Sequence, residues 1–364
     1  MGVAMSFQTP LSNHTPFAAE KFVLIGPQGQ EAVLVVLAAT FKTSNAVLQL
    51  ADEQAGVRLT DAYSGPPGQS SLLSTHELAL FKPLVDVIIS GSAYAPGGRP
   101  AERVPIEVRV GDVQKALWAF GHRVWAAGLL TRPHPFTKMP LLWERAFGGV
   151  SPRTGAAFDR NPIGLGFDGA RSIEGLPGEL PNLEYQTAPI RRHSDAPPPA
   201  GLSPIAPSWE PRRSLAGTYD QRWLETKWPL LPTDFDPKHN QTAPVDQQSR
   251  TIVGGEPVRL LNLTPDGLWT FRLPVLDVPV HLLYDRGVKR VALKLDTVEL
   301  EPDTRRVRLT ARVSHETVRG SERLREIVLG HMGEAWLRAR QSGRMYIDHR
   351  NTRGVDPSRP TYRV

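Results

Sequence analysis

The sequence predicts a mainly-β protein in which two sandwich-like β-sheet regions are joined by a long, ordered, irregular segment. Short runs rich in β-branched residues recur near both ends of the chain. The 34 prolines and 31 glycines among 364 residues disfavour long helices and favour turns. The middle of the chain combines frequent proline with tryptophan, which is typical of packed but irregular structure. A short α-helical extension is expected at the C-terminus.

The first β region is expected over residues 20–130. Residues 32–41 (AVLVVLAATF) are rich in β-branched side chains, which predicts a buried strand. Residues 104–110 alternate apolar and polar side chains, and the break Gly111-Asp112 before residues 113–122 predicts a hairpin. Further short strands are expected at 46–51, 57–60 and 84–93.

The segment 131–257 is predicted to be ordered but irregular. Its run Pro197-Pro198-Pro199 cannot belong to a helix interior or to a central strand. Disordered linkers are poor in aromatic residues, whereas this segment is rich in them, so we expect its aromatic side chains to anchor it on the sheets. Most of them should be buried. Phe136 and Trp209 lie near prolines and are expected to be exposed.

Strand patterns return over residues 258–315, which are expected to form the second β region. The runs expected to be strands are 258–263, 269–273, 280–284, 291–295 and 307–313. Residues 316–364 are expected to be a C-terminal extension with a short helix and a polar tail. Ser321 is a candidate start for a helix, and residues 333–341 contain strong helix formers. Residues 20–315 would then form one domain.

Composition excludes several classes of protein. The chain has no cysteine, which excludes thiol nucleophiles, disulfides and cysteine-bound metal centres. Its net charge of +6 is a weak excess without a basic block, so direct nucleic-acid binding is not expected. The first sixteen residues lack a signal-peptide pattern, and residues 32–41 are too few to cross a bilayer. We expect a cytoplasmic protein without a membrane partner.

Residues 164–169 (GLGFDG) match the dinucleotide-binding pattern G-x-G-x-x-G. That chemistry needs a strand before the glycines and a helix after them, so that pyrophosphate meets the helix N-terminus. Here Asn161-Pro162 precedes the glycines and Pro177 follows them. The pattern therefore favours a glycine-rich turn where backbones approach closely, and no cofactor is expected.

Five acidic or histidine residues lie near one another in the sequence: Asp220, Asp234, Asp236, His239 and Asp246. They could serve a hydrolase as paired carboxylates or as a metal site. Their spacing fits no helical or metal-binding motif, and aspartates beside proline or glycine are typical of turns. We favour the structural interpretation, with no catalytic and no metal-binding residue expected.

Eight short motifs follow one another through the middle of the chain. They are WERAFGG (143–149), NPIGLG (161–166), PIAPSWEPR (204–212), GTYDQRW (217–223), PTDF (232–235), APVDQ (243–247), GGE (254–256) and LP (273–274). In this order they resemble a bacterial family of effector adaptors, or chaperones, that is encoded in type VI secretion loci. The resemblance covers roughly residues 20–315. Each motif alone is weak, but the ordered set is specific.

The resemblance implies a set of motif residues with structural or partner-binding roles. They are Trp143, Arg145, Phe147, Gly148, Gly149, Asn161, Pro162, Gly164, Gly166, Trp209, Gly217, Thr218, Tyr219, Asp220, Trp223, Asp234, Phe235, Gln247, Gly254 and Glu256.

The resemblance also implies a non-catalytic function. Such adaptors bind a toxin effector, often a nuclease, in the cytoplasm and help to load it onto the valine-glycine-repeat spike protein. The residue types agree with this function, because aromatic and arginine side chains on loops suit protein interfaces. Two alternatives stay open at this point: a structural component of a contractile injection particle, and a carboxylate-dependent hydrolase.

Overall fold

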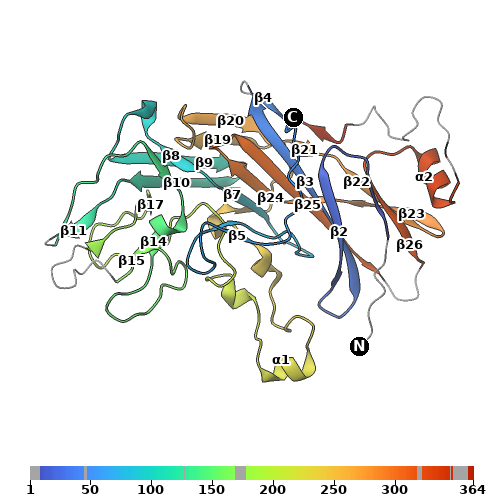
Figure 1. Ribbon diagram of the computed structural model, residues 1–364, viewed down its shortest axis with the longest axis horizontal. Coiled ribbons are helices and arrows are strands. Elements are labelled where there is room, and N and C mark those ends of the chain that lie inside the picture. The colour runs from blue at the N-terminus through green and yellow to red at the C-terminus, as the bar shows by residue number, and fades with distance from the viewer. Residues whose placement is uncertain are drawn as a thin grey trace.

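The computed structural model describes residues 9–44, 47–126, 128–168, 178–317, 322–344, 346 and 360–364. It confirms the predicted mainly-β class. Two α-helices occur in these residues, α1 (Gln221–Thr226) and α2 (Glu334–Gln341), and both are short. Three larger sheets carry most of the remaining regular structure (Figure 1).

The largest sheet has seven strands. In spatial order they are β18 (Gln248–Ser249), β7 (Val85–Ile89), β24 (Lys294–Glu301), β25 (Arg306–Thr317), β3 (Glu31–Ser44) and β2 (Ala18–Ile25), with β4 (Val47–Leu50) paired to the far end of β3. The long antiparallel pair of β3 and β25 forms its centre. β3 is buried along most of its length, as its continuous apolar run predicts.

The second sheet has five strands, and the third has four. The second consists of β17 (Leu183–Tyr185), β10 (Val113–Phe120), β9 (Arg103–Val110), β19 (Pro257–Leu261) and β20 (Leu268–Arg272). The third consists of β1 (Leu11–Asn13), β26 (Leu324–Leu329), β22 (Pro279–Tyr284) and β23 (Gly287–Ala292).

Short elements complete the fold. The small sheets are β12 (Leu129–Leu130) with β11 (Val124–Ala126) and β16 (Gly178–Glu179); β13 (Lys138–Pro140) with β8 (Ser92–Tyr94); β14 (Phe147–Gly148) with β15 (Leu165–Gly166); β21 (Val275–Leu276) with β27 (Tyr362–Arg363); and β5 (Ala62–Tyr63) with β6 (Leu72–Ser74). The 3₁₀ turns are η1 (Pro96–Gly98), η2 (Trp143–Arg145), η3 (Arg213–Leu215), η4 (Pro237–Asn240) and η5 (Val245–Gln247).

The two predicted β regions interleave. β7 of the first region pairs in parallel with β24 of the second. β9 of the first region pairs with β19, which lies in the second region apart from its first residue. One continuous apolar core contains side chains from all three larger sheets, such as Leu37, Val108 and Leu282. Strands far apart in the sequence therefore share both sheets and core.

Several local predictions are confirmed. The hairpin at Gly111-Asp112 forms, with Val110 opposite Val113, and the C-terminal helix forms as α2. The expected strand at 57–60 is wrong. That segment bonds instead to Glu77, whose backbone N–H donates to Arg58 and whose carboxylate accepts from the Arg58 N–H, both at 2.8 Å. The expected helix start at Ser321 lies outside the described residues.

The middle of the chain is irregular, as predicted, and carries the α1 helix that the sequence interpretation missed. Residues 216–235, here called the arm, leave the body and return to it, with α1 at the far end (Figure 1). The turn between β2 and β3 lies beside the arm, since a Cβ atom on Gly29 would be 3.7 Å from the methyl groups of Leu230. None of the helices in the described residues has the length and apolar composition needed to span a membrane.

Candidate functional site

The first two motifs fold together around Asn161. Its side chain is fully buried, and its Nδ2 donates to the carbonyls of Trp143 at 2.9 Å and Phe147 at 3.0 Å. β14 and β15, which come from these two motifs, pair in parallel through Phe147 and Leu165. The WERAFGG and NPIGLG motifs therefore form one packed unit, here called the motif knot (residues 143–149 and 161–166).

Glycine is required in the motif knot because backbones touch there. A Cβ atom on Gly148 would lie 2.1 Å from the carbonyl oxygen of Asn161, and one on Gly149 would lie 2.4 Å from that of Gly164. Both glycines also have positive φ, 146° and 103°. The glycine-rich turn expected at 164–169 is thus in place as far as Asp168, while Gly169 lies outside the described residues.

Trp143 and Trp209 pack edge to face, with ring centroids 5.8 Å apart. The Nε1 of Trp143 donates to the carbonyl of Pro204 at 2.9 Å, and Gly201 lies against its ring. Trp209 is only 2% exposed, so the expectation that it is exposed is wrong. Its ring lies in a small apolar cluster with Trp143 and Leu72.

Phe136 is half-buried against the main core, so its expected exposure is also wrong. Three further motif residues are part of the motif knot itself. Arg145 donates through Nη1 to Asn182 Oδ1 at 3.2 Å, and Gly166 lies opposite Gly148 in the small sheet. Pro162 is half-buried beside them.

The later motif residues Gln247, Gly254 and Glu256 also make internal contacts. Gln247 is buried, and its Nε2 donates to the carbonyls of Val87 at 2.7 Å and Leu202 at 3.0 Å. The Glu256 carboxylate accepts from the N–H of Gly254 at 2.9 Å. These motifs hold loops against the sheets.

A buried lysine lies beside this segment. The Nζ of Lys115 on β10 donates to the carbonyl of Gly201 at 2.7 Å, to Gln247 Oε1 at 2.8 Å and to Asp246 at 2.9 Å. Burial lowers the pKa of Lys115 to about 8, although Asp246 opposes this shift. Asp246 also accepts from the hydroxyl of Tyr185 at 2.8 Å. Asp246 and Gln247 of the APVDQ motif therefore cover this lysine, an arrangement here called the Lys115 cap.

The base of the arm is closed by three motif residues. Asp234 accepts from the backbone N–H of Thr218 at 3.0 Å and from its hydroxyl at 2.7 Å. These hydrogen bonds lower the pKa of the Asp234 carboxyl. Gly217 has a φ of 84°, and a Cβ atom there would lie 2.9 Å from Pro232. The two sides of the arm are therefore fixed to each other where they leave the body, close to half-buried Phe235.

The far end of the arm is ordered by Asp220 and Trp223. Asp220 caps α1 by accepting from the N–H of Trp223 at 2.8 Å, as an aspartate at a helix N-cap commonly does. The Nε1 of Trp223 donates to the carbonyl of Leu230 at 2.9 Å. Its ring packs edge to face with Tyr219, with centroids 4.8 Å apart.

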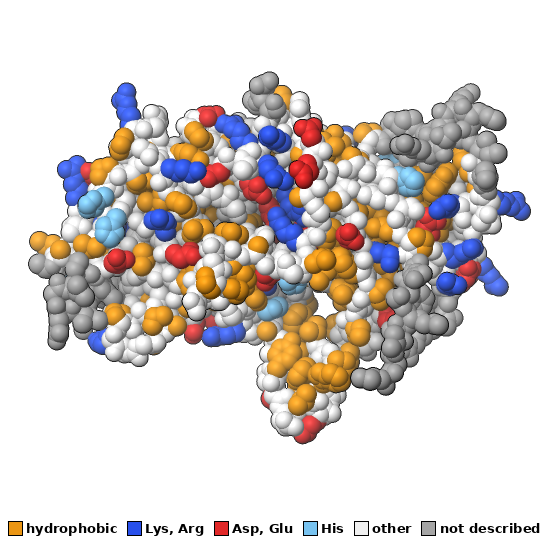
Figure 2. Space-filling view, in the orientation of Figure 1, with side chains coloured by type: hydrophobic (Ala, Val, Ile, Leu, Met, Phe, Trp, Pro, Cys, Tyr) orange, Lys and Arg blue, Asp and Glu red, His pale blue; other side chains and the backbone are white. Residues whose placement is uncertain are grey.

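This internal order leaves apolar side chains in solvent. Tyr219 is 54% exposed, Leu224 52% and Trp228 65%. Figure 2 shows hydrophobic side chains gathered on the arm, where few charged ones interrupt them. Only Tyr219 among these three belongs to the motif residues. Leu224 and Trp228 were missed because exposure of an apolar residue in an irregular segment has no periodic signal in the sequence.

The five residues considered for a hydrolase do not converge. Asp220, Asp234 and Asp236 each accept local backbone hydrogen bonds, Asp236 from Lys238 at 2.8 Å. His239 Nδ1 lies 2.8 Å from the carbonyl of Arg212, and Asp246 pairs with Lys115. No group of three or more potential metal ligands occurs within the part of the chain that the structure describes.

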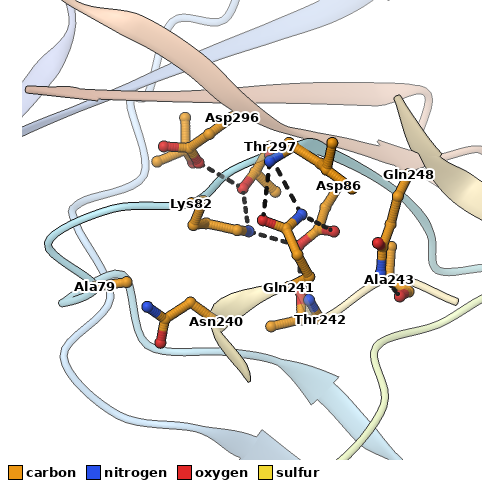
Figure 3. Close-up of polar contacts among 12 residues, drawn as sticks. Ala79, Lys82, Asp86, Asn240, Gln241, Thr242, Ala243, Gln248, Asp296 and Thr297 are labelled. Carbon is orange, nitrogen blue, oxygen red and sulfur yellow. Dashed lines mark hydrogen bonds and ion pairs between the residues drawn. The ribbon is translucent and has the colours of Figure 1, made fainter. Parts of the chain in front are cut away.

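A buried polar cluster was not predicted. Asp86 on β7 is fully buried and accepts from Lys82 Nζ, at 2.5 Å, and from the side chain of Gln241 and the N–H of Thr242, both at 2.8 Å (Figure 3). Lys82 Nζ also donates to Thr297 at 2.9 Å. This cluster ties the loop after the arm to β7 and β24 of the seven-stranded sheet.

Comparison with known proteins gives one family. A protein-family model described as "Uncharacterized protein conserved in bacteria (DUF2169)" matches residues 28–312, which contain the motif knot, the arm and the buried polar cluster. No curated protein and no solved structure gives a significant match.

Proposed function

The chain belongs to the bacterial DUF2169 family, and from that premise we propose that it is a non-catalytic cytoplasmic adaptor, or chaperone, for a type VI secretion toxin effector. It would bind the effector and help to load it onto the valine-glycine-repeat spike protein. The observation that carries the proposal is the arm, which is internally ordered and yet exposes Tyr219, Leu224 and Trp228.

Exposed apolar clusters of this kind favour protein binding. Burying a tryptophan or tyrosine ring in a partner gains apolar transfer energy, and such rings dominate binding energy at many interfaces. Because the arm is already ordered by Asp220, Trp223 and Asp234, less conformational entropy is lost on binding. The motif residues would thus mainly hold the arm in its shape, while neighbouring side chains such as Leu224 and Trp228 would contact the partner.

Three other parts of the structure support a rigid platform for the arm. The motif knot, the Lys115 cap and the buried polar cluster all fix irregular segments on the sheets. Loops held on a rigid scaffold commonly carry binding function.

The test is co-purification with the effector encoded beside this gene and with the spike protein. A triple variant, Tyr219→Ser, Leu224→Ser and Trp228→Ser, should reduce effector binding at least tenfold. The matched control is Leu129→Ser with Val253→Ser, two apolar side chains that are more than 70% exposed and lie outside the arm. Normal binding by the triple variant would refute the role of the arm. Failure of the wild type to bind either partner at micromolar concentration would refute the adaptor function.

A further inference from the structure

A small cavity of about 70 Å³ lies between the seven-stranded sheet and the loops that flank the arm. Four ion pairs surround it in the described residues, and one member of each pair lines it. The pairs are Arg58–Glu299 (2.5 Å), Lys82–Asp86 (2.5 Å), Arg308–Glu77 (2.9 Å) and Arg312–Asp296. These four cations and four carboxylates balance one another.

Arg212 also lines the cavity, and it has no such partner. Its Nε donates to the carbonyl of His239 at 2.9 Å and its Nη1 to that of Ile205 at 2.6 Å, and both acceptors are neutral. Asp61 and Asp86 are the carboxylates whose charges act on it, but no ion pair within 4 Å joins Arg212 to either. The residue is only 6% exposed.

The Nη2 of Arg212 has no hydrogen-bond partner in the described part of the chain. Arginine presents five N–H donors and stays charged inside proteins, although burial lowers the pKa of Arg212. A buried guanidinium without a counter-ion is costly, so a native structure normally supplies one. Asp86 is already paired with Lys82 and Asp61 makes no ion pair with Arg212, so what the guanidinium lacks is a directly bonded anionic acceptor at the cavity.

We propose that this cavity binds a small monovalent anion, of the size of chloride or formate, against Arg212. The other lining groups suit such an anion, because Thr75, Thr242 and Asn240 are polar and His76 is exposed at its edge. A single water needs about 10–15 Å³ of such volume, so the cavity accommodates a small anion with accompanying water.

The same lining favours a monovalent anion over a more highly charged one. Glu77 and Glu299 line the cavity too, and each is neutralised by its own arginine, so of the lining cations that the structure describes Arg212 alone lacks an ion pair and one negative charge suffices to match it. The site therefore differs from a phosphate site, where several unpaired cations and backbone N–H groups converge. A bound anion would link the loop that contains Arg212, next to the arm, to the seven-stranded sheet.

The test uses the full chain in chloride-free gluconate buffer at constant ionic strength. The midpoint temperature of unfolding should rise as chloride replaces gluconate, because a ligand that binds only the folded state stabilises it in proportion to the logarithm of its concentration. A parallel formate series distinguishes a carboxylate from an inorganic anion as the preferred occupant. Coincident midpoints in gluconate, chloride and formate would overturn the proposal.

Two variants make the assignment specific. Arg212→Gln should abolish the dependence on chloride and formate, whereas Arg213→Gln, the adjacent and exposed arginine, should retain it. An Arg212→Gln protein with the wild-type dependence would contradict the site. If that variant does not fold, crystals of the wild type soaked in bromide replace it. An anomalous peak within hydrogen-bonding distance of Arg212 Nη2 is expected there, and a cavity that contains water alone would overturn the proposal.

Discussion

The side-chain amide of Asn161 donates a 2.9 Å hydrogen bond to the main-chain carbonyl of Trp143, 18 residues earlier in the chain. This bond joins the WERAFGG and NPIGLG motifs, which look independent in the sequence. Its acceptor lies in the η2 turn, which also places the Trp143 ring against Trp209. The motif knot is therefore held from inside by one polar side chain.

Replacing that side chain should destabilise the protein without touching its surface. Asn161→Ala would remove the side-chain donor from two buried carbonyls, of which that of Trp143 keeps the N–H of Ala146 at 3.1 Å, and is expected to cost about 1–3 kcal/mol of unfolding free energy. Urea denaturation measures it. Asn240→Ala is the control, because Asn240 donates to Phe81 near the surface and should cost less than about 1 kcal/mol. Equal effects of the two variants would contradict the structural role of Asn161.

Gly148 and Gly155 provide a matched pair for the close approach in the motif knot. Both have positive φ, but a Cβ atom on Gly148 would lie 2.1 Å from the Asn161 carbonyl oxygen, whereas nothing lies within 4 Å of one on Gly155. Gly155→Ala should cost about 1–2 kcal/mol from backbone strain alone. Gly148→Ala should cost at least about 2 kcal/mol more, because the backbone must move. Denaturant midpoints of similar size would disprove the close contact.

The pH dependence of stability should report on Lys115. Its pKa in the folded protein is lowered to about 8, mainly by burial, so between pH 8 and 10 the unfolded chain binds more protons than the folded one. Stability therefore rises with pH in this window. Relative to Lys115→Met, the wild type should gain about 2 kcal/mol of unfolding free energy from pH 7 to pH 10.

Urea denaturation of both proteins at pH 6, 7, 8, 9 and 10 measures this gain. The interval from pH 6 to 7 is the internal control, because Lys115 is protonated there in both states and the difference between the proteins should be constant. A difference that also stays constant up to pH 10 would mean that Asp246 and Gln247 hold the lysine charged.

The fold class was predictable because it depends on local patterns. The continuous apolar run at 32–41 predicted β3, and the alternation around Gly111-Asp112 predicted the hairpin of β9 and β10. Which strands pair with each other was not predictable. The pairing of β3 with β25 joins residues more than 260 positions apart, and no local pattern specifies a partner at that distance.

The site was predictable in part, for a related reason. The motifs named the residues of the motif knot and of the base of the arm, but not that the first two motifs pack together or that Gly217 and Asp234 meet. The burial of Trp209 and the exposure of Trp228 could not be read from the sequence, since both rings lie near prolines in irregular backbone. The unpaired charge of Arg212 was also hidden. It emerges only when the four surrounding ion pairs are known.

Trp228 and Trp209 allow folding and binding to be separated by experiment. Trp228 is 65% exposed, so Trp228→Ala should change the unfolding free energy by less than about 1 kcal/mol while weakening effector binding at least fivefold. Trp209 is buried against Trp143, so Trp209→Ala should cost about 3–5 kcal/mol.

Chemical denaturation and effector titration of both variants provide the readout. At a temperature where both remain folded, the buried variant should bind the effector nearly as well as the wild type, because it changes no exposed atom of the arm. A Trp228→Ala protein that keeps full affinity would move the binding surface away from the arm. A large loss of stability in the same variant would mean instead that the ring packs inside the protein, and the exposed arm would no longer support an adaptor.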